Sequence, residues 1–73
     1  MKKSDTKIRV IVVEKLLRDN PKGMTVKQIL FYLELQFNIT ADRKSIYDDI
    51  CVLTLLYDVQ KIRKGSNTVY VMR

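Results

Sequence analysis

Histidine and tryptophan are absent from this sequence, and cysteine and proline occur once each. Without histidine the sequence lacks both the commonest general base at neutral pH and the commonest zinc ligand. The single Cys51 cannot form an intramolecular disulfide, and a nucleophile would have to be activated by Asp, Glu or Lys. We therefore expect a protein that is not an enzyme and that binds no metal or cofactor.

Long apolar runs are lacking as well. Runs such as VIVV at 10–13 are far shorter than the ~20 residues that a helix needs to cross a bilayer. The start, MKKSDTKIR, has neither the apolar stretch nor the small-residue cleavage site of a signal peptide. With 47% hydrophobic residues and no Gly-, Ser- or Pro-rich segment, we expect residues 1–73 to form a single folded domain. The expected location is cytoplasmic, with no membrane partner.

Charge is unevenly balanced. The sequence has 14 Lys and Arg residues against 8 Asp and Glu, a net charge of +6 and a pI near 9.7. For so small a domain, this balance favours a polyanionic partner, nucleic acid before a membrane surface. The alternative is an ordinary solvated basic face, so the placement of the charges has to decide.

Apolar periodicity predicts two helices in the first half of the sequence. The first covers about 6–19 and ends at the turn residues NPKG, 20–23. The second begins at a capping box, because Thr25 is followed three residues later by Gln28. Its apolar stripe consists of Val26, Ile29, Leu30, Leu33 and Phe37.

The second half predicts one more helix and a hairpin. Asp42 is the expected N-cap of a third helix. Its buried stripe is expected to consist of Ile46, Ile50, Leu53 and Tyr57. Residues 59–63 then alternate as a strand, KGSN supplies a turn, and TVYVM is rich in strand-forming residues. The predicted fold class is α+β: a three-helix winged helix-turn-helix with a C-terminal β-hairpin wing.

The stretch DRKSIYDDICVL, 42–53, resembles the recognition helix of the winged helix-turn-helix that begins WYL-domain transcription regulators and DeoR-like repressors. That family has a polar cap, two basic residues, Ser or Thr, an aliphatic residue, Tyr, Arg, Asp, Ile and, three residues on, Leu. The residues that fit are Asp42, Arg43, Lys44, Ser45, Ile46, Tyr47, Asp49, Ile50 and Leu53. The upstream stretch GMTVKQILFYLELQFNI also resembles the family's second helix and the turn after it. Asp48 departs from the pattern, because it stands where these regulators usually carry Arg.

The resemblance implies a sequence-specific double-stranded DNA-binding protein, a small bacterial or mobile-element transcription regulator. It places the third helix in the major groove and the basic wing on the backbone or in the minor groove. Such regulators usually carry an effector-sensing domain after the wing, where this sequence ends. We therefore expect a protein that acts by occupying its site, with no small-molecule ligand.

Asp48 and Asp49 are adjacent carboxylates, but a helix directs them to different sides. At 100° per residue, Asp49 lies about 60° and Asp48 about 160° from the centre of the buried face, so they do not form a catalytic pair. Asp49 is expected to pair with a basic residue elsewhere in the fold. Asp48 is expected either to pair with Lys44 or to accept a hydrogen bond from a base edge.

The residues expected to contact DNA come from the third helix and the hairpin. They are Arg43, Lys44, Ser45, Tyr47, Asp48, Lys61, Arg63 and Lys64. The alternatives are that Arg43 and Lys44 are ordinary exposed charges, that Tyr47 packs on the flank of the core, and that the hairpin charges only discourage strand aggregation. The terminal residues Lys2, Lys3 and Lys7 form a further, weaker candidate as a backbone-binding arm.

More apolar residues are present than three helices can bury. The first helix is apolar on almost every side. Apolar residues beyond the expected stripes of the second and third helices are Phe31, Tyr32, Leu35, Val52 and Leu55. This surplus predicts a homodimer or a partner protein, with the interface on the first helix, where Val10→Glu or Val13→Glu should leave the fold intact. It also supports two alternative functions: a winged-helix protein-interaction module, or an accessory DNA-binding factor for DNA transfer or replication.

Overall fold

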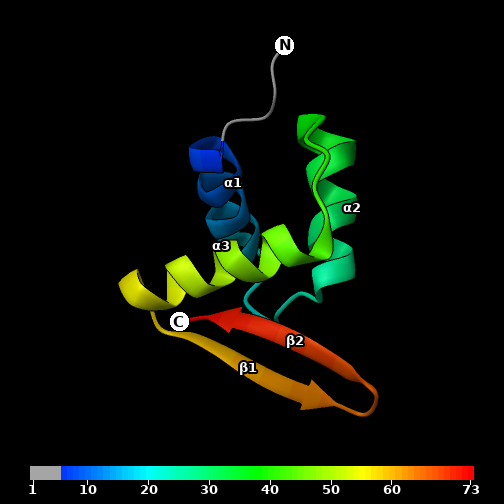
Figure 1. Ribbon diagram of the computed structural model, residues 1–73. Helices are drawn as coiled ribbons and strands as arrows, with labels where there is room; N and C mark the ends of the chain where they lie inside the picture. Colours follow the sequence, from blue (N-terminus) through cyan, green and yellow to red (C-terminus); the bar gives the residue numbers. More distant parts are fainter. Residues whose placement is uncertain (1–5) are drawn as a thin grey trace.

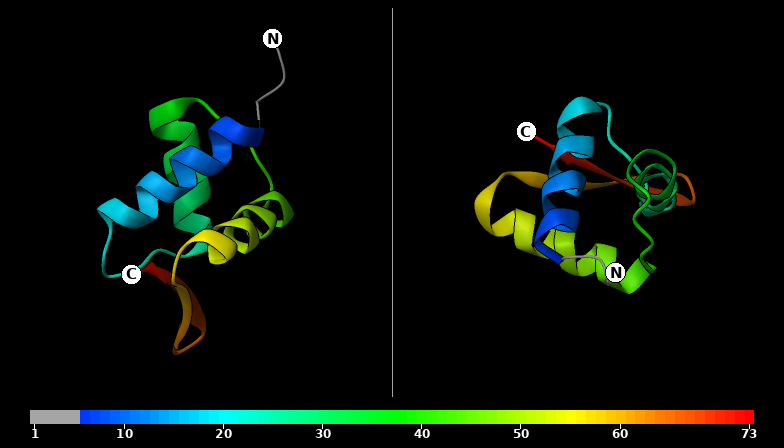
Figure 2. Two further views of the ribbon diagram at one scale, coloured as in Figure 1. Left: turned by 90° about the vertical axis from the view of Figure 1, so that its left-hand side faces the viewer. Right: turned by 90° about the horizontal axis from the view of Figure 1, so that it is seen from above.

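The computed structural model describes residues 6–73. Three helices, α1 (Thr6–Asp19), α2 (Val26–Phe37) and α3 (Arg43–Leu56), are followed by strands β1 (Val59–Lys64) and β2 (Asn67–Met72). The strands form one two-stranded antiparallel sheet. In Figure 1 and in the left view of Figure 2 this hairpin lies below the three helices. The predicted α+β class, with three helices and a C-terminal hairpin, is confirmed.

The connection from α1 to α2 turns sharply and packs against the hairpin. The side-chain amide of Asn20 donates to the Leu16 carbonyl at 2.7 Å and so satisfies one of the last acceptors of α1. Gly23 adopts φ +103°, and a Cβ there would lie 2.9 Å from Cγ2 of Val71. Glycine is therefore required at this position both by the backbone conformation and by the close approach of β2.

Both ends of α2 are held by local hydrogen bonds. The predicted capping box is confirmed, because the Gln28 N–H donates to Oγ1 of Thr25 at 3.1 Å and the Thr25 N–H donates to the Gln28 side chain at 3.0 Å. At the other end Asn38 is left-handed, with φ 56°, and the Ile39 N–H donates to the Leu33 carbonyl at 3.0 Å. The Asn38 N–H donates to the Glu34 carbonyl at 3.2 Å, which is the five-residue closure of an αL cap, and the chain turns from there toward α3.

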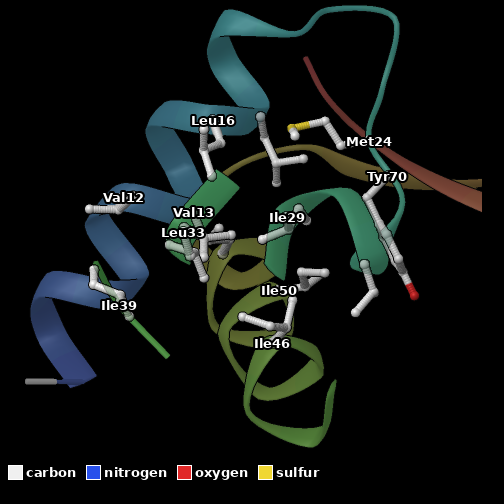
Figure 3. Close-up of a cluster of buried hydrophobic side chains, with 13 residues drawn as sticks. Val12, Val13, Leu16, Met24, Ile29, Leu33, Ile39, Ile46, Ile50 and Tyr70 are labelled. Carbon is white, nitrogen blue, oxygen red and sulfur yellow. The ribbon is translucent and has the colours of Figure 1, made fainter. Parts of the chain in front are cut away.

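The core lies between the three helices and β2, as the close-up in Figure 3 illustrates. The buried cluster consists of Val12, Val13, Leu16, Leu17, Met24, Val26, Ile29, Leu33, Ile39, Ile46, Ile50, Leu53 and Tyr70. Each fully buried aliphatic side chain stabilises the fold by about 1.5–3 kcal/mol relative to exposure. The core therefore draws on every helix and ties the wing to them.

Several predicted positions on the helices are corrected by this packing. Val13 is fully buried, so the prediction that Val13→Glu would leave the fold intact is wrong: the charge would enter the core without a partner. On α3, Asp49 is buried beside the apolar stripe, while Tyr57 is only half-buried as the C-cap residue. Phe37, expected in the stripe of α2, is exposed because the helix ends there.

The hairpin register places Lys61 opposite Tyr70 and Lys64 opposite Asn67, around a turn at Gly65 and Ser66. Gly65 has φ +63°, which a tight hairpin turn requires. A further bridge joins Met24 to Tyr70: the Met24 N–H donates to the Tyr70 carbonyl at 3.0 Å, and the Tyr70 N–H donates to the Met24 carbonyl at 2.8 Å. The segment before α2 is thus paired with β2, and it fixes the hairpin against the helices.

Large apolar side chains remain exposed on all three helices. They are Ile8, Ile11, Phe31, Leu35, Phe37, Tyr47, Val52, Leu55 and Leu56. On α1 the exposed apolar residues are Ile8 and Ile11, while Val10 is half-buried and packs against the core. Within residues 6–73, no helix has the length and apolar character needed to cross a bilayer.

Candidate nucleic-acid interface

The first turn of α3 is held by its N-cap. Asp42 accepts a hydrogen bond from the Ser45 N–H at 2.8 Å, as predicted. The hydrogen bonds from Ser45 lower the pKa of the Asp42 carboxyl below its ordinary value. Arg43 and Lys44 follow directly and are both exposed. The Asp42 carboxylate is therefore engaged by the helix backbone, and the first turn of α3 exposes two cations.

A groove of about 440 Å³ runs between the start of α2, the start of α3 and the hairpin. Its lining combines basic, hydroxyl and amide side chains with two tyrosines. The lining residues are Thr25, Val26, Lys27, Arg43, Tyr47, Lys61, Ser66, Asn67, Thr68 and Tyr70. Of the predicted contact residues, the fold brings Arg43, Tyr47 and Lys61 together here.

The side chains from residues 6–73 that line the groove include three cations and no carboxylate. Lys27, Arg43 and Lys61 take part in none of the ion pairs that form among residues 6–73. Lys27 lies in the first turn of α2, and Arg43 is the first residue of α3, so two helix N-termini adjoin the same space. Backbone N–H groups and the helix dipole at such ends favour an anion. The groove is therefore an electropositive site open to a negatively charged ligand.

Tyr70 contributes the most deeply buried side chain of the groove's polar lining. Only 8% of the residue is exposed, and burial, with a smaller contribution from nearby Tyr47, raises the pKa of its hydroxyl. That hydroxyl forms no hydrogen bond with any residue from 6 to 73. In Figure 3 the ring extends from β2, and its oxygen lies at the outer edge of the buried cluster.

A second, more apolar cleft of about 240 Å³ continues between α3 and β1. Tyr47, Lys61 and Tyr70 line both spaces and so separate them. The cleft adds Ile50, Cys51, Thr54 and Val59 to the lining. The side of α3 that faces the wing is therefore polar at its start and apolar further along.

The other predicted contact residues lie outside the groove. Lys44 and Asp48 are exposed on α3, and Arg63 and Lys64 are exposed on β1. Lys44 and Asp48 do not form the alternative ion pair within the described part of the chain.

Ser45 and the three terminal lysines complete the predicted set. Ser45 is half-buried, and its N–H is used in the cap. Lys2 and Lys3 fall outside residues 6–73, while Lys7 is exposed on α1. Neither Ser45 nor Lys7 lines the groove.

Asp49 points away from this surface, as predicted. Its carboxylate accepts two hydrogen bonds from Arg9 of α1, from Nε at 2.5 Å and from Nη2 at 3.0 Å. The Asp49 side chain is 2% exposed and that of Arg9 12%, and donating these hydrogen bonds to the Asp49 carboxylate raises the pKa of Arg9 above its ordinary value. The pair joins α1 to α3 and leaves Asp49 no role at the surface.

Sequence reasoning missed Lys27 and Tyr70. The predicted contacts were confined to the third helix, the hairpin and the N-terminal arm, so they did not include Lys27. Its position just after the Thr25 cap is the sequence signal that identifies it as a first-turn cation. Tyr70 was counted only as a strand-forming residue, and its partner across the hairpin was not known. Among residues 6–73, no group of three or more His, Cys, Asp or Glu is placed to hold a metal ion.

No family model, curated protein or solved structure matches this chain.

Proposed function

We propose that this protein binds double-stranded DNA at specific sequences, as a small cytoplasmic transcription regulator of a bacterium or a mobile element. The observation that carries the proposal is the groove that, among residues 6–73, is lined by three cations, Lys27, Arg43 and Lys61, and by no carboxylate. Unpaired cations that converge beside two helix N-termini suit the phosphate backbone.

The exposed side of α3 supplies the reading function in this proposal. Lys44 and Asp48 lie one turn apart, both exposed and outside the groove. Lys recognises guanine through O6 and N7, and Asp accepts a hydrogen bond from cytosine N4, so the two side chains suit base edges in the major groove. Arg43, Tyr47 and Lys61 then hold the backbone and fix the register.

Arg63 and Lys64 extend the basic surface along the wing, beyond the groove. Their exposure suits further contacts with the backbone or the minor groove. The resemblance of residues 42–53 to the recognition helix of WYL-domain and DeoR-like regulators supports the same proposal.

Selection from a random duplex library tests the proposal, followed by titration of the selected duplex at several salt concentrations. Because each phosphate contact releases counterions, log Kd should change with log salt by about 0.9 per contact. Lys15→Ala is a matched control, since Lys15 is exposed and pairs with Asp19 on α1. A flat salt response, or no enriched sequence, would contradict sequence-specific DNA binding.

A second candidate, a protein-interaction module, is favoured by the C-terminal half of α3. Leu55 is 83% exposed and Leu56 70%, and Val52 lies one turn before them. Neither DNA nor the core accounts for these side chains. A homodimer on a two-fold DNA site would use such a surface, as would a partner protein.

Sedimentation equilibrium, with and without the selected duplex, separates these cases. A dimer supports two copies on adjacent half-sites, and a palindromic selected sequence would agree with it. A monomer in both conditions would exclude the homodimer and leave the partner protein. A role in DNA transfer or replication would use the same DNA-binding surface, so it differs from transcription regulation in where the selected sequence lies in the source genome.

A further inference from the structure

We propose that the groove binds one phosphodiester of the DNA backbone, and that the Tyr70 hydroxyl donates a hydrogen bond to its phosphate oxygen while Lys27, Arg43 and Lys61 balance its charge. The inference rests on the proposed function and deepens it: it assigns the wing to the backbone beside α3 and names the atom that selects a phosphate there.

The first support is the condition of the Tyr70 side chain. The ring is packed in the core, but the hydroxyl is not enclosed there: no buried side-chain oxygen among residues 6–73 lacks a hydrogen-bond partner, and the Tyr70 hydroxyl has none. The hydroxyl is therefore open at the surface of the groove that Tyr70 lines. A donor without an internal partner is available to a ligand bound in that groove.

The second support is the way in which Tyr70 is held. Its backbone pairs with Lys61 on one side and bridges to Met24 on the other. Because the backbone of Tyr70 is held on both sides, its side chain is already ordered, and binding a ligand costs little further conformational entropy. The hydroxyl is thus positioned before any ligand arrives.

The third support is the charge around it. Lys61 lies directly across the hairpin from Tyr70, and directly opposed residues project to the same face of an antiparallel pair. Lys27 and Arg43 reach the same groove from the first turns of α2 and α3. A phosphodiester carries one negative charge and can accept from several donors, whereas a neutral or cationic ligand would leave these three cations unbalanced.

The protonation state of Tyr70 agrees with this role. Because burial raises the pKa of its hydroxyl above the ordinary value of 10.0, the group keeps its proton throughout the neutral range. It therefore acts as a hydrogen-bond donor toward an anion. Contacts of this kind carry no base information, so the effect should be the same on every sequence.

The test is a methylphosphonate scan of the selected duplex, in which each phosphate in turn is replaced by a neutral analogue. Wild type should lose about tenfold in affinity at one or two positions, the value of a hydrogen bond to a charged group. Tyr70→Phe should bind the unmodified duplex about tenfold more weakly and should lose less affinity than wild type at one of those positions, where the remaining loss comes from the three cations. Tyr32→Phe, which removes a hydroxyl from half-buried Tyr32 outside the groove, is the matched control.

A stability measurement separates this role from a structural one. Because the Tyr70 hydroxyl makes no internal hydrogen bond, Tyr70→Phe should melt at the wild-type temperature or slightly above it. Lys61→Ala and Lys64→Ala change the charge of β1 equally, but only Lys61 lines the groove. Only Lys61→Ala should reduce the sensitivity to the methylphosphonate at the position where Tyr70→Phe reduces it.

A separate measurement with inorganic phosphate covers the case in which no duplex binds. If no duplex binds but phosphate shifts the NMR signals of the Tyr70 ring in wild type, and not those of the Tyr32 ring, the groove is an anion site for a free phosphate. In that case the DNA-binding function is overturned and the anion site stands. If duplex binds but Tyr70→Phe has the wild-type affinity and methylphosphonate profile, the phosphate site is overturned and the DNA function stands. If neither duplex nor phosphate binds, both proposals are overturned.

Discussion

Two groups of charged side chains flank α3 and are used in opposite ways. On the side of α1, Arg9 and Asp49 are buried, joined by two hydrogen bonds and closed to any ligand. On the side of the wing, Lys27, Arg43 and Lys61 border an open groove without a carboxylate. The comparison teaches that a basic residue in a small domain acquires its role from whether the fold supplies its counterion. Arg9 is part of the fold, and the groove cations are available for a ligand.

The largest expected effect is on the closed pair. Asp49→Ala should lower the free energy of unfolding by about 3–5 kcal/mol, because it leaves the Arg9 guanidinium without its partner between α1 and α3. For a domain of 73 residues, this is a large share of the whole stability. Urea denaturation followed by circular dichroism measures the loss.

The control for that measurement is Asp19→Ala, which removes the partner of Lys15 in an exposed pair. It should change stability by less than about 1 kcal/mol. Equal losses from Asp19→Ala and Asp49→Ala would show that the closed pair is no different from a surface pair.

Removing a groove cation should lower the affinity for DNA and leave the stability of the fold nearly unchanged. Arg43→Ala should leave the free energy of unfolding within about 0.5 kcal/mol of wild type, because Arg43 is exposed and forms no ion pair within residues 6–73. Its affinity for the selected duplex should fall, and the salt slope should decrease by about 0.9. Fluorescence anisotropy at several salt concentrations measures both quantities. An unchanged slope would remove Arg43 from the backbone contacts.

Lys44 and Asp48, exposed on α3, extend the comparison to sequence preference. Substitutions there should change which base pairs the protein prefers as well as its affinity for DNA. Lys44→Ala or Asp48→Ala should alter discrimination at particular base pairs by roughly 1–3 kcal/mol. Lys64→Ala should weaken binding by a similar factor on all sequences. Competition between the selected duplex and its single-base variants measures this. Uniform scaling by all three substitutions would show that α3 does not read bases.

The smallest expected effect concerns Asp42 and acid. Hydrogen bonding from Ser45 holds the pKa of Asp42 below its ordinary value of 3.8 in the folded protein. The carboxylate therefore stabilises the fold fully above about pH 4, and this contribution is lost as the pH falls through the lower, folded-state pKa. Asp42→Ala should be slightly less stable than wild type at pH 7, and the difference should shrink toward pH 2. Thermal melts at both pH values measure it, and a constant difference would assign the effect to something other than the carboxylate.

Local signals made most of the fold predictable. The capping box at Thr25, the N-cap at Asp42 and the turn after α1 depend on neighbouring residues, and each is found where the sequence places it. The ion pair of Asp49 was predicted in kind, but its partner, Arg9, is 40 positions away. A helical wheel shows that Asp49, and not Asp48, turns inward. Only the packing of α1 on α3 shows that its partner is Arg9.

The candidate site was less predictable, because the groove is made by three segments distant in sequence. Arg43 and Lys61 were predicted from their place on the third helix and the hairpin, but Lys27 and Tyr70 join them only through the pairing of β2 with the segment before α2. Val13 shows the same limit in the core. An apolar helix gives weak evidence on which of its sides faces inward, and contact with α2 and α3 decides it.

The Met24–Tyr70 bridge has a consequence for the order in which the protein opens. Two backbone hydrogen bonds, 3.0 and 2.8 Å long, link positions separated by nearly two thirds of the chain. Such contacts form only after a long loop has closed, and their rupture requires the hairpin to leave the helices. In hydrogen exchange, the amides of Met24 and Tyr70 should therefore exchange with the slowest class, together with those of the buried helical core, whereas amides near the Gly65 turn should exchange by local opening.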